Sequence, residues 1–460
     1  MDTVDVLVIG GGPAGLSAAA TAAGLGLACL LVDEQEEPGG QIYRSIELNA
    51  AVASEADRHT LGEEYFVGKA VVARFRSSGA GYAPRHRVWF ADPDGTVAMS
   101  GPDSSWRVRA RNIVICTGAM ERPNPIKGWT LPGVLTAGGA QVLLKASRTF
   151  PESAVLAGSG PLLFQAAVQL ARAGTRIAGL LDTTPLSNYA APTRVPLATL
   201  ANPRYLLKGV ALVAELIRRR VPIASGVEEM ELIGRDRAEG LQYRTRGGAF
   251  REISAEVVLL HSGIVPQTGF TEALGCDHSW DPVQEYWHPV RDEWGATSVP
   301  GIWVAGDSGG ISGARAAEAL GALAAIGCAL KMGVLDRPLA EKRAAQHRVL
   351  LRVERRGRRF VDLLFRPGRI ALKDETTVCR CECISAGEIR ALVRDGAVGP
   401  TQVKAFSRAG MGPCQGRMCG ASVVGIIAEE LGVDRETIPR LRARYPAKPV
   451  ALGDIASLLD

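Results

Sequence analysis

The chain has 460 residues with a formal net charge of +5, and it is longer than one hydrophobic core usually serves, so we expect two or three domains. Glycine contributes 53 residues, above its usual share of about 7%, and the glycines gather at predicted strand-to-helix turns. This distribution favours an α/β nucleotide-binding architecture and excludes a low-complexity chain. No nucleic-acid-binding motif accompanies the positive charge, so nucleic acid is not an expected partner.

The N-terminus and the cysteines predict a cytoplasmic protein. Residues 2–5 lack the basic segment of a signal peptide, and nine cysteines in a chain of this length do not make the framework of a small secreted domain. Two alanine-rich stretches, 18–32 and 316–335, are interrupted by glycines or charges. We interpret both as buried helices, and no transmembrane segment is expected.

The first predicted elements are a buried strand at residues 6–9, a glycine-rich loop and a helix at residues 16–23. In such a loop the first glycine permits a tight turn, the second lets a pyrophosphate touch the backbone, and the third lets the helix pack closely on the strand. The phosphates then lie at the helix N-terminus. The predicted nucleotide-binding residues of this loop are Gly10, Gly12, Pro13, Ala14 and Gly15.

A second predicted strand, residues 28–32, ends at two acidic residues, Asp33 and Glu34. They follow Gly15 by eighteen and nineteen residues, where a carboxylate would accept hydrogen bonds from the ribose hydroxyls of a dinucleotide. A glycine motif alone is weak support for nucleotide binding. The order of strand, loop, helix, strand and acid makes it strong.

Three distant segments resemble motifs of flavoproteins that have two dinucleotide-binding domains, and the resemblance implies FAD as the cofactor. In that resemblance Asp307 would hold the ribityl chain, and the helix that begins near Gly313 would stabilise negative charge on a reduced isoalloxazine. The residues that carry it are Gly40 and Gln41, Thr117 and Gly118, and Gly306, Asp307, Gly313 and Ala314.

A second nucleotide-binding loop, residues 158–163, follows another predicted strand. The next strand, residues 176–181, ends at Asp182, nineteen residues beyond Leu163. Leu163 stands where glycine or alanine is usual, which is expected to weaken close helix packing. NAD(P), another adenine nucleotide and a retained but empty fold all stay open, so the second adenine nucleotide is uncertain.

Two kinds of catalytic group are missing from the sequence. The cysteines outside the C-terminal region form no C-x-x-C pair, so a disulfide-reductase mechanism lacks its dithiol. The six histidines are scattered, and none is recognisable as a base for substrate oxidation. The catalytic residues are therefore unknown, and we expect a chain that relays electrons without meeting the organic substrate.

The segment 336–369 holds eleven Lys or Arg residues against four Asp or Glu residues, a net charge of +7. We interpret residues 336–371 as a basic linker. A solvated helix face is the first explanation of the charge. Docking of an acidic partner surface comes second, and nucleic acid or anionic lipid comes last.

Near the C-terminus four cysteines follow the pattern C-x-C, thirty-two residues, C-x4-C. Each iron of a [2Fe-2S] cluster takes two cysteine sulfurs beside its two bridging sulfides, whereas structural zinc usually has longer spacers between paired ligands. The one-residue spacer therefore favours the iron-sulfur cluster over zinc, and Cys383 is a further thiol that could substitute for one ligand. Glycines 410, 412, 416 and 420 would let backbone N–H groups approach the sulfurs. The predicted ligands are Cys379, Cys381, Cys414 and Cys419.

Residues 377 to 430 resemble the [2Fe-2S] domain of the bacterioferritin-associated ferredoxin type. Together with the first glycine loop, Gly39-Gly40-Gln41 and residues 132–141, they make the chain similar to the larger, FAD- and [2Fe-2S]-bearing subunit of bacterial opine oxidases, hydrogen cyanide synthase and hydroxyproline dehydrogenases. That family is similar to the α subunit of heterotetrameric sarcosine oxidase. The resemblance implies a partner that is an amine-oxidising flavoprotein β subunit, room for a small third subunit, and an FMN between subunits.

The predicted fold is α/β, with two Rossmann-like dinucleotide-binding domains, one inserted in the other, and a small helical C-terminal [2Fe-2S] domain. We expect the FAD domain at residues 1–130 and 285–335, the second nucleotide-binding-like domain at 131–284, and the [2Fe-2S] domain at 372–460.

Two functions compete at this stage. The first is an electron-transfer subunit of a hetero-oligomeric dehydrogenase or oxidase that acts on an amine or imino acid, such as an opine, hydroxyproline or a glycine-like substrate. The second is a stand-alone NAD(P)H-dependent FAD reductase of a redox partner protein. A scaffold with vestigial cofactor sites is a third, weaker interpretation.

Overall fold

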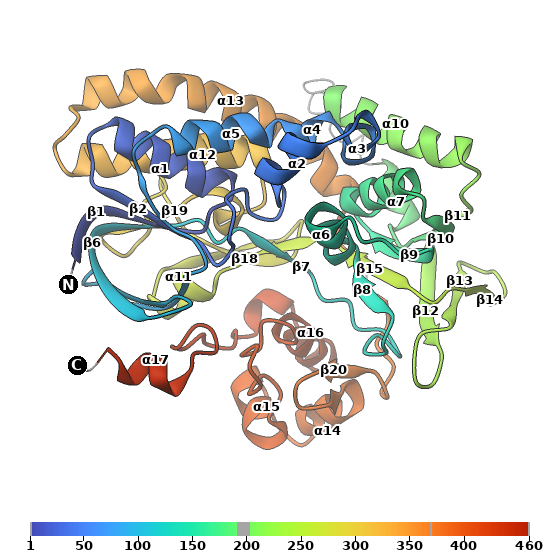
Figure 1. Ribbon diagram of the computed structural model, residues 1–460. Helices are drawn as coiled ribbons and strands as arrows, with labels where there is room; N and C mark the ends of the chain where they lie inside the picture. The colour runs from blue at the N-terminus through green and yellow to red at the C-terminus, as the bar shows by residue number, and fades with distance from the viewer. Residues whose placement is uncertain (1, 191–202, 369, 459–460) are drawn as a thin grey trace.

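The computed structural model describes residues 2–190, 203–368 and 370–458. Two α/β domains lie side by side, and a small, mainly helical domain packs beneath them (Figure 1).

The first domain is built on a seven-stranded sheet. Strand β6 is its centre: its C-terminal part lies parallel to β1 and β19, with Ile115 beside both Ile9 and Val304, and its N-terminal part pairs antiparallel with β5. The strands are β1 (Asp2–Ile9), β2 (Cys29–Val32), β3 (Gly81–Ala83), β4 (Arg87–Ala91), β5 (Thr96–Ser100), β6 (Ser105–Ile115) and β19 (Ile302–Val304).

Helices α1 (Pro13–Gly24) and α12 (Ala314–Lys331) cover one face of this sheet. They approach so closely that a Cβ on Gly321 would lie 2.0 Å from the carbonyl oxygen of Ala14. Only glycine fits at such a crossing. The alanine-rich stretches are thus buried helices over residues 18–24 and 316–331, whereas the end of the first stretch, Cys29–Val32, is strand β2. Smaller helices follow β2 along the same side: α2 (Ile46–Val52), α3 (Glu55–Leu61), α4 (Glu63–Phe66) and α5 (Gly68–Arg76).

The segment interpreted as a basic linker is instead a 28-residue helix, α13 (Arg337–Leu364). It lies over α12 as a further layer of the first domain (Figure 1). Asp336 caps its N-terminus by accepting a hydrogen bond from the backbone N–H of Leu339 at 2.9 Å. Ala340, Ala344 and Leu351 are buried in the same core cluster as α12. The sequence offered a helix with a solvated, charged face as the first explanation of the charge, but it did not show the narrow apolar stripe that packs on α12.

The second domain has a five-stranded parallel sheet in the order β11-β10-β9-β15-β8. Helices α6 (Ala137–Ser147), α7 (Pro161–Ala173) and α10 (Pro203–Arg218) pack around it, and a three-stranded antiparallel sheet extends from it. The strands are β8 (Val134–Thr136), β9 (Ser153–Ser159), β10 (Arg176–Asp182), β11 (Ile223–Ser225), β15 (Val258–Ser262), and β12 (Val227–Ile233), β13 (Gly240–Thr245) and β14 (Arg251–Ser254); the short helix η1 spans Leu186–Ala190.

The chain crosses between the two domains through β7 (Ala119–Glu121) and β16 (Ile264–Pro266), which pair antiparallel. The next elements are α11 (Gly269–Ala273), β17 (His278–Asp281) and β18 (Tyr286–Pro289). Phe270 and Cys276 are buried in the core cluster that contains Leu7 of the first sheet. Residues after the second crossing therefore pack with the first domain, which moves the predicted boundary at 284 back to about the end of β16.

The C-terminal domain has its own core, in which Ile389, Val403 and Ile427 are buried. A capping box between Ser385 and Glu388 starts its first long helix. Its elements are β20 (Thr377–Cys379), β21 (Ile384–Ser385), α14 (Ala386–Arg394), α15 (Pro400–Ser407), α16 (Gly420–Leu431) and η3 (Arg435–Thr437); α17 (Leu452–Ala456) follows. Across the three described ranges, none of the helices combines the length and the apolar character that a bilayer crossing requires.

Candidate functional site

The first glycine loop has the geometry expected of a phosphate-binding turn. Gly10 has a φ of +108°, and a Cβ there would lie 2.5 Å from the carbonyl oxygen of Cys116. A Cβ on Gly15 would lie 1.8 Å from the carbonyl oxygen of Gly10. Gly12 differs, because its nearest neighbour would be the Cα of Gly40, 4.0 Å away. Two glycines are thus required by the fold, while Gly12 leaves open space beside the N-terminus of α1.

The two acidic residues after β2 have different surroundings. Asp33 is buried and accepts hydrogen bonds from the backbone N–H groups of Gly11 and of Gln35, the latter at 2.6 Å. Burial raises the pKa of Asp33, against the effect of these two hydrogen bonds. Glu34 is exposed and forms an ion pair with Lys448. Asp33 therefore clamps the loop, and Glu34 faces a segment that is more than four hundred residues away in sequence.

The segment Gly39-Gly40-Gln41 closes over the first loop. The N–H of Gly39 donates to the carbonyl oxygen of Gly11 at 2.8 Å, and a Cβ on Gly40 would lie 2.8 Å from the Cα of Gly12. Lys145 of α6 holds this segment in place. Its Nζ donates hydrogen bonds to the carbonyl oxygens of Gln41 and Ile42 at 3.3 and 3.0 Å. Burial lowers the pKa of Lys145 to about 8. Sequence reasoning missed Lys145, because a lysine on an amphipathic helix is usually solvent-facing.

Asp307 lies in the turn η2 (Gly306–Gly309) after β19. Its Oδ1 accepts hydrogen bonds from the N–H groups of Ser312 and Gly313 at 2.8 and 3.1 Å, which holds the turn at the N-terminus of α12. Gly306 has a φ of +73°, and a Cβ there would lie 2.7 Å from the Cβ of Ala14. The turn thus brings Asp307 and the starts of α1 and α12 to one edge of the sheet.

Thr117 and Gly118 continue this edge after β6. The Thr117 hydroxyl donates to the carbonyl oxygen of Gln267 at 3.2 Å, and the N–H of Gln267 donates to the carbonyl oxygen of Gly118 at 3.0 Å. All segments predicted to bind the dinucleotide therefore gather at the carboxyl ends of β1, β2, β6 and β19, where ligands bind in open α/β sheets.

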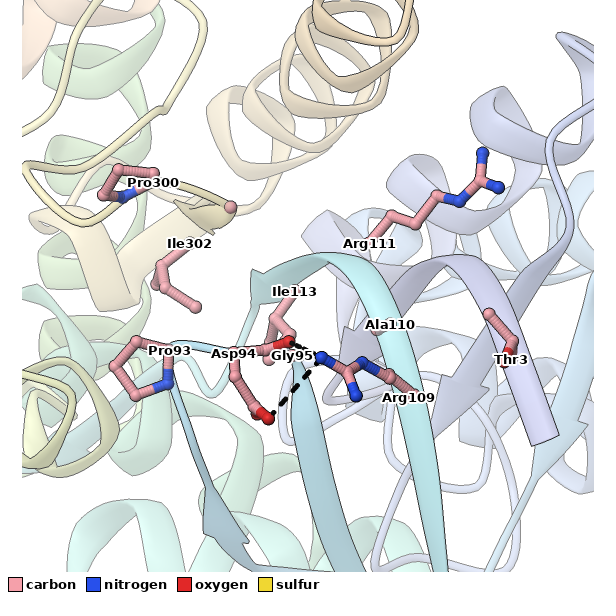
Figure 2. A pocket seen from close by; sticks show the side chains of 11 residues that line it. Thr3, Pro93, Asp94, Gly95, Arg109, Ala110, Arg111, Ile113, Pro300 and Ile302 are labelled. Atoms are coloured by element: carbon pink, nitrogen blue, oxygen red, sulfur yellow. Dashed lines mark hydrogen bonds and ion pairs between the residues drawn. The ribbon is translucent and has the colours of Figure 1, made fainter. Parts of the chain in front are cut away.

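A cavity of 280 Å³ (Figure 2) lies away from the segments that are predicted to bind the dinucleotide. It is lined by Thr3 near the amino end of β1 and by Gly301 and Ile302 at the start of β19. Arg109 and Asp94 also line this cavity, and they contact each other there. Because it opens at the amino ends of parallel strands, it is not a candidate for the dinucleotide site.

The second glycine loop is closed by its own neighbours. Asp182 is completely buried; its Oδ1 accepts a hydrogen bond from the N–H of Thr184 at 3.0 Å, and its Oδ2 accepts one from the hydroxyl of Tyr189. Leu163 is also completely buried, so α7 packs on the sheet despite the large residue. The carboxylate that would accept a ribose is engaged by the protein itself, which weighs against a nucleotide here.

A buried acid-base pair joins the second glycine loop to the domain crossing. The Nδ1 of His261, at the end of β15, lies 2.6 Å from Oε1 of Glu121 on β7, and Oε2 of Glu121 accepts a hydrogen bond from the N–H of Gly138 at 3.0 Å. Burial would raise the pKa of Glu121, but the contact with His261 outweighs it and the pKa is lowered. Sequence reasoning found no role for His261, since its partner lies 140 residues away.

The structure brings the four predicted cluster cysteines together. Cys381 interacts with Cys414 and Cys379, and Cys419 interacts with Cys379 and Cys414. Burial and the neighbouring thiols raise the pKa of Cys381 and Cys419. Iron ions would reverse this effect, because a cation favours the thiolate. Four thiolates, two for each iron, are what a [2Fe-2S] cluster requires, so the donor set fits this group.

Cys383 is the further thiol near the predicted ligands. Its side chain is exposed, and its Sγ contacts the carbonyl oxygen of Arg380 at 3.9 Å. Among the residues that the structure describes, no three Cys, His, Asp or Glu side chains converge closely enough to hold a single metal ion. The one-residue spacer between Cys379 and Cys381 is the reason to favour a two-iron cluster over zinc.

The glycines around the cysteines have two different roles. A Cβ on Gly412 would lie 2.1 Å from the Cβ of Cys381, so this position cannot carry a side chain. The nearest atom to a Cβ on each of the other three glycines is the Leu441 side chain, at 2.9 Å for Gly410, 2.7 Å for Gly416 and 3.8 Å for Gly420. These three glycines therefore make room for Leu441, and their approach to the cluster sulfurs stays a prediction.

Known proteins share this organisation. Residues 4–321 match the family described as pyridine nucleotide-disulphide oxidoreductase, and residues 377–429 match the BFD-like [2Fe-2S] binding domain. The chain is 40% identical to an opine oxidase subunit of Rhizobium meliloti, over 100% of both chains, and to the corresponding opine oxidase subunit of Agrobacterium tumefaciens, over 99% of this chain and 92% of the relative. It is 30% identical to hydrogen cyanide synthase subunit HcnB of Pseudomonas aeruginosa, over 98% of both.

A solved structure has the same fold throughout. The crystal structure of L-proline dehydrogenase from P. horikoshii superposes with a TM-score of 0.72 over 98% of this chain and 79% of that one, at 18% identity. The two α/β domains alone resemble T. acidophilum thioredoxin reductase, with a TM-score of 0.53 over 72% of this chain and 99% of that one, at 20% identity. The chain therefore belongs to the pyridine nucleotide-disulphide oxidoreductase family, among the relatives of these opine oxidase subunits, and carries a BFD-like [2Fe-2S] binding domain.

Proposed function

We propose that this chain is the electron-transfer subunit of a hetero-oligomeric oxidoreductase that acts on C–N bonds, of the opine oxidase type. The observation that carries the proposal is the full-length similarity to proteins named as subunits of opine oxidase and hydrogen cyanide synthase. It is supported by the sequence outside the C-terminal region, which has no C-x-x-C pair and no histidine recognisable as a base for substrate oxidation. In this proposal a partner, the amine-oxidising flavoprotein β subunit, meets an amine or imino acid.

We further propose that the dinucleotide at the first site is FAD and that the four cysteines hold a [2Fe-2S] cluster. Bound there, FAD would exchange electrons in pairs and the cluster would exchange them singly. The residues of this chain orient the dinucleotide through the first glycine loop and Asp307, and they bring the cluster thiolates together. By similarity to sarcosine oxidase, an FMN and a small third subunit belong to the assembled enzyme.

An apolar stripe on α10 is the surface that we assign to the partner subunit. Leu206, Val210, Val213 and Ile217 recur at helical spacing, and each is at least 36% exposed. On the opposite face Glu215 is held by Arg172, so the helix is anchored and the stripe faces outward. Exposed apolar surface of this kind marks protein contacts.

Affinity purification of the tagged chain from its source cells tests the proposal. A second flavoprotein subunit should be recovered, and only that complex should reduce an artificial dye with an opine, an imino acid or a glycine-like substrate. Val210→Glu with Ile217→Glu should abolish recovery of the second flavoprotein, whereas Arg218→Gln, an exposed change on the same helix that adds no charge beside Glu215, should not. Dye reduction by the chain alone with such a substrate would contradict the proposal.

A further inference from the structure

A cavity of 360 Å³ lies between β18, the loop before α12 and the C-terminal half of α13. Its volume is within the range of about 300–1,000 Å³ that is typical of small-molecule sites. Apart from the loop that precedes α12, it is separate from the segments predicted to bind the dinucleotide or the cluster. The lining residues that matter here are Arg291, Arg355, Arg358 and Arg359, with Asp281, Asp362, Tyr286, His288 and Ser312.

Positive charge dominates the walls of this arginine pocket. Four arginines face two aspartates, which leaves a net charge of +2. Both aspartates are already engaged: Asp362 pairs with the Nε of Arg358 at 2.6 Å, and Asp281 accepts hydrogen bonds from two backbone N–H groups of the hairpin turn at 2.8 and 2.9 Å. Of the four arginines, Arg358 is the one for which the described part of the chain supplies a side-chain hydrogen bond and ion pair.

Arg291 is the arginine of this pocket whose positive charge is least favoured by its surroundings. It follows β18, its guanidinium lies against the backbone of Gly309, and a Cβ on that glycine would lie 2.9 Å from its Cζ. Burial and the charge of Arg355 lower its pKa to about 10. A half-buried guanidinium of this kind is disfavoured in its charged form unless an anion accompanies it. The acids that act on it are Asp307 and Asp292, and one oxygen of each already accepts hydrogen bonds from backbone N–H groups.

We propose that the arginine pocket binds the phosphate group of a small phosphomonoester or inorganic phosphate. Arg355 and Arg359 are one turn apart on α13, and Arg291 approaches from a different element. Three guanidinium groups that line one cavity from two elements suit a tetrahedral dianion, whereas a flat carboxylate takes a single fork. The Tyr286 hydroxyl accepts a hydrogen bond from the N–H of Ile311 at 3.1 Å, so its own proton is available to the ligand, and the pocket has room for the remainder of an ester.

This site is separate from the proposed function, and it borders the dinucleotide only through the loop that holds Asp307. It goes beyond that function because a phosphate dianion bound here would contact both the loop that precedes α12 and the C-terminal half of α13. Neither the substrate of the partner subunit nor the cluster enters the argument.

Isothermal titration of the whole chain, with its dinucleotide site saturated, tests the proposal. Inorganic phosphate, glycerol 3-phosphate and succinate are titrated separately. One phosphate or phosphomonoester should bind per chain, and succinate should bind at least about tenfold more weakly. Tighter binding of glycerol 3-phosphate than of phosphate would identify the occupant as a phosphorylated small molecule, and the reverse order would identify free phosphate; both support the site.

Two sets of variants locate the binding. Arg291→Gln should weaken phosphate binding by about tenfold or more, and the exposed pair Arg355→Gln with Arg359→Gln should do so without risk to folding. Arg356→Gln removes an equal charge from the same helix but lies outside the pocket, and it should leave the affinity unchanged. Phosphate affinity that is the same in all variants, equal binding of succinate, or no phosphate binding at all would overturn the proposal.

Discussion

At the scale of single residues, Asp307 has two tasks that the sequence motif does not separate. Its carboxylate is predicted to hold the ribityl chain of FAD, and it also accepts hydrogen bonds from Ser312 and Gly313. Asp307→Ala should therefore weaken FAD binding by about tenfold to a hundredfold, since lost hydrogen bonds to a charged group cost about 1–3 kcal/mol. Fluorescence titration of the flavin-free chain measures this affinity.

Asp336→Ala is the matched control for Asp307→Ala. Asp336 also caps a helix, by accepting a hydrogen bond from Leu339 at 2.9 Å, but it lies at α13. Its loss should cost about 1 kcal/mol of folding stability and leave the flavin affinity unchanged. Equal flavin affinities for Asp307→Ala and the unmodified chain would show that Asp307 serves the turn alone.

Lys145 predicts a dependence of stability on pH. Burial lowers its pKa to about 8, against about 10.4 in an unfolded chain. Between these values the unfolded chain binds more protons, so the free energy of unfolding rises with pH, by up to about 1.4 kcal/mol per pH unit. Below about pH 8 the full cost of the buried charge is present. A neutral amine has two N–H donors, which match the carbonyl oxygens of Gln41 and Ile42.

Urea unfolding at several values between pH 7 and pH 10 checks this dependence. The stability difference between the unmodified chain and Lys145→Met should become more favourable to the unmodified chain as pH rises through 8. Lys342→Met, a change at a lysine of α13, is the control and should give a flat difference. A flat difference for Lys145→Met as well would mean that this amine keeps its ordinary pKa.

At the scale of elements, the chain after η3 is the tie between the cluster loop and the first domain. Gln415 and Arg417 of the cluster loop donate to the carbonyl oxygens of Pro446 and Ala447 at 2.7 and 2.6 Å. The N–H of Ala447 in turn donates to the carbonyl oxygen of Trp89 on β4 at 2.7 Å. The ring of Tyr445 lies 5.0 Å from that of Phe90. The [2Fe-2S] domain is thus fastened to the dinucleotide sheet close to its own cysteines.

Removal of this tie should loosen the cluster. A chain that ends before Tyr445 should lose its visible [2Fe-2S] absorbance in air several times faster than the full chain, because the loop that carries Cys414 and Cys419 loses two hydrogen bonds. A chain that ends before Leu452 lacks only the segment with α17 and should behave like the full chain. Identical decay of all three chains would show that the loop is rigid without the tie.

Features that depend on residues close together in the sequence could be predicted, whereas features that depend on contacts between distant segments could not. Glycine turns and the spacing of Cys379 and Cys381 are local patterns, so the segments around them could be predicted. The pairs Glu121 with His261 and Asp182 with Tyr189 depend on packing that no local pattern records. The packing of α13 could not be foreseen for a similar reason, since its apolar stripe becomes meaningful only against α12.

At the scale of the whole molecule, the second α/β domain has the topology of a nucleotide-binding domain, but its expected ribose acceptor is closed. Asp182 is completely buried and bonded to Thr184 and Tyr189, and the Ser159 hydroxyl of the glycine loop lies 2.9 Å from that of Thr184. Opening this network would cost about 1–3 kcal/mol for each polar group that is left unpaired. This cost opposes NAD(P)H binding and favours a chain that receives its electrons from a partner.

Anaerobic absorbance of the isolated chain therefore distinguishes the electron-transfer subunit from a stand-alone reductase. Neither NADH nor NADPH at micromolar concentration should bleach the flavin rapidly, whereas dithionite should bleach it fully and serves as the control for a competent flavin. Tyr189→Phe removes one bond to Asp182 and frees an oxygen of that carboxylate, so it should make any residual reduction by NADH faster. Rapid bleaching of the unmodified chain by NAD(P)H would mean that Asp182 exchanges Tyr189 for a ribose, and the electron path would then begin within this chain.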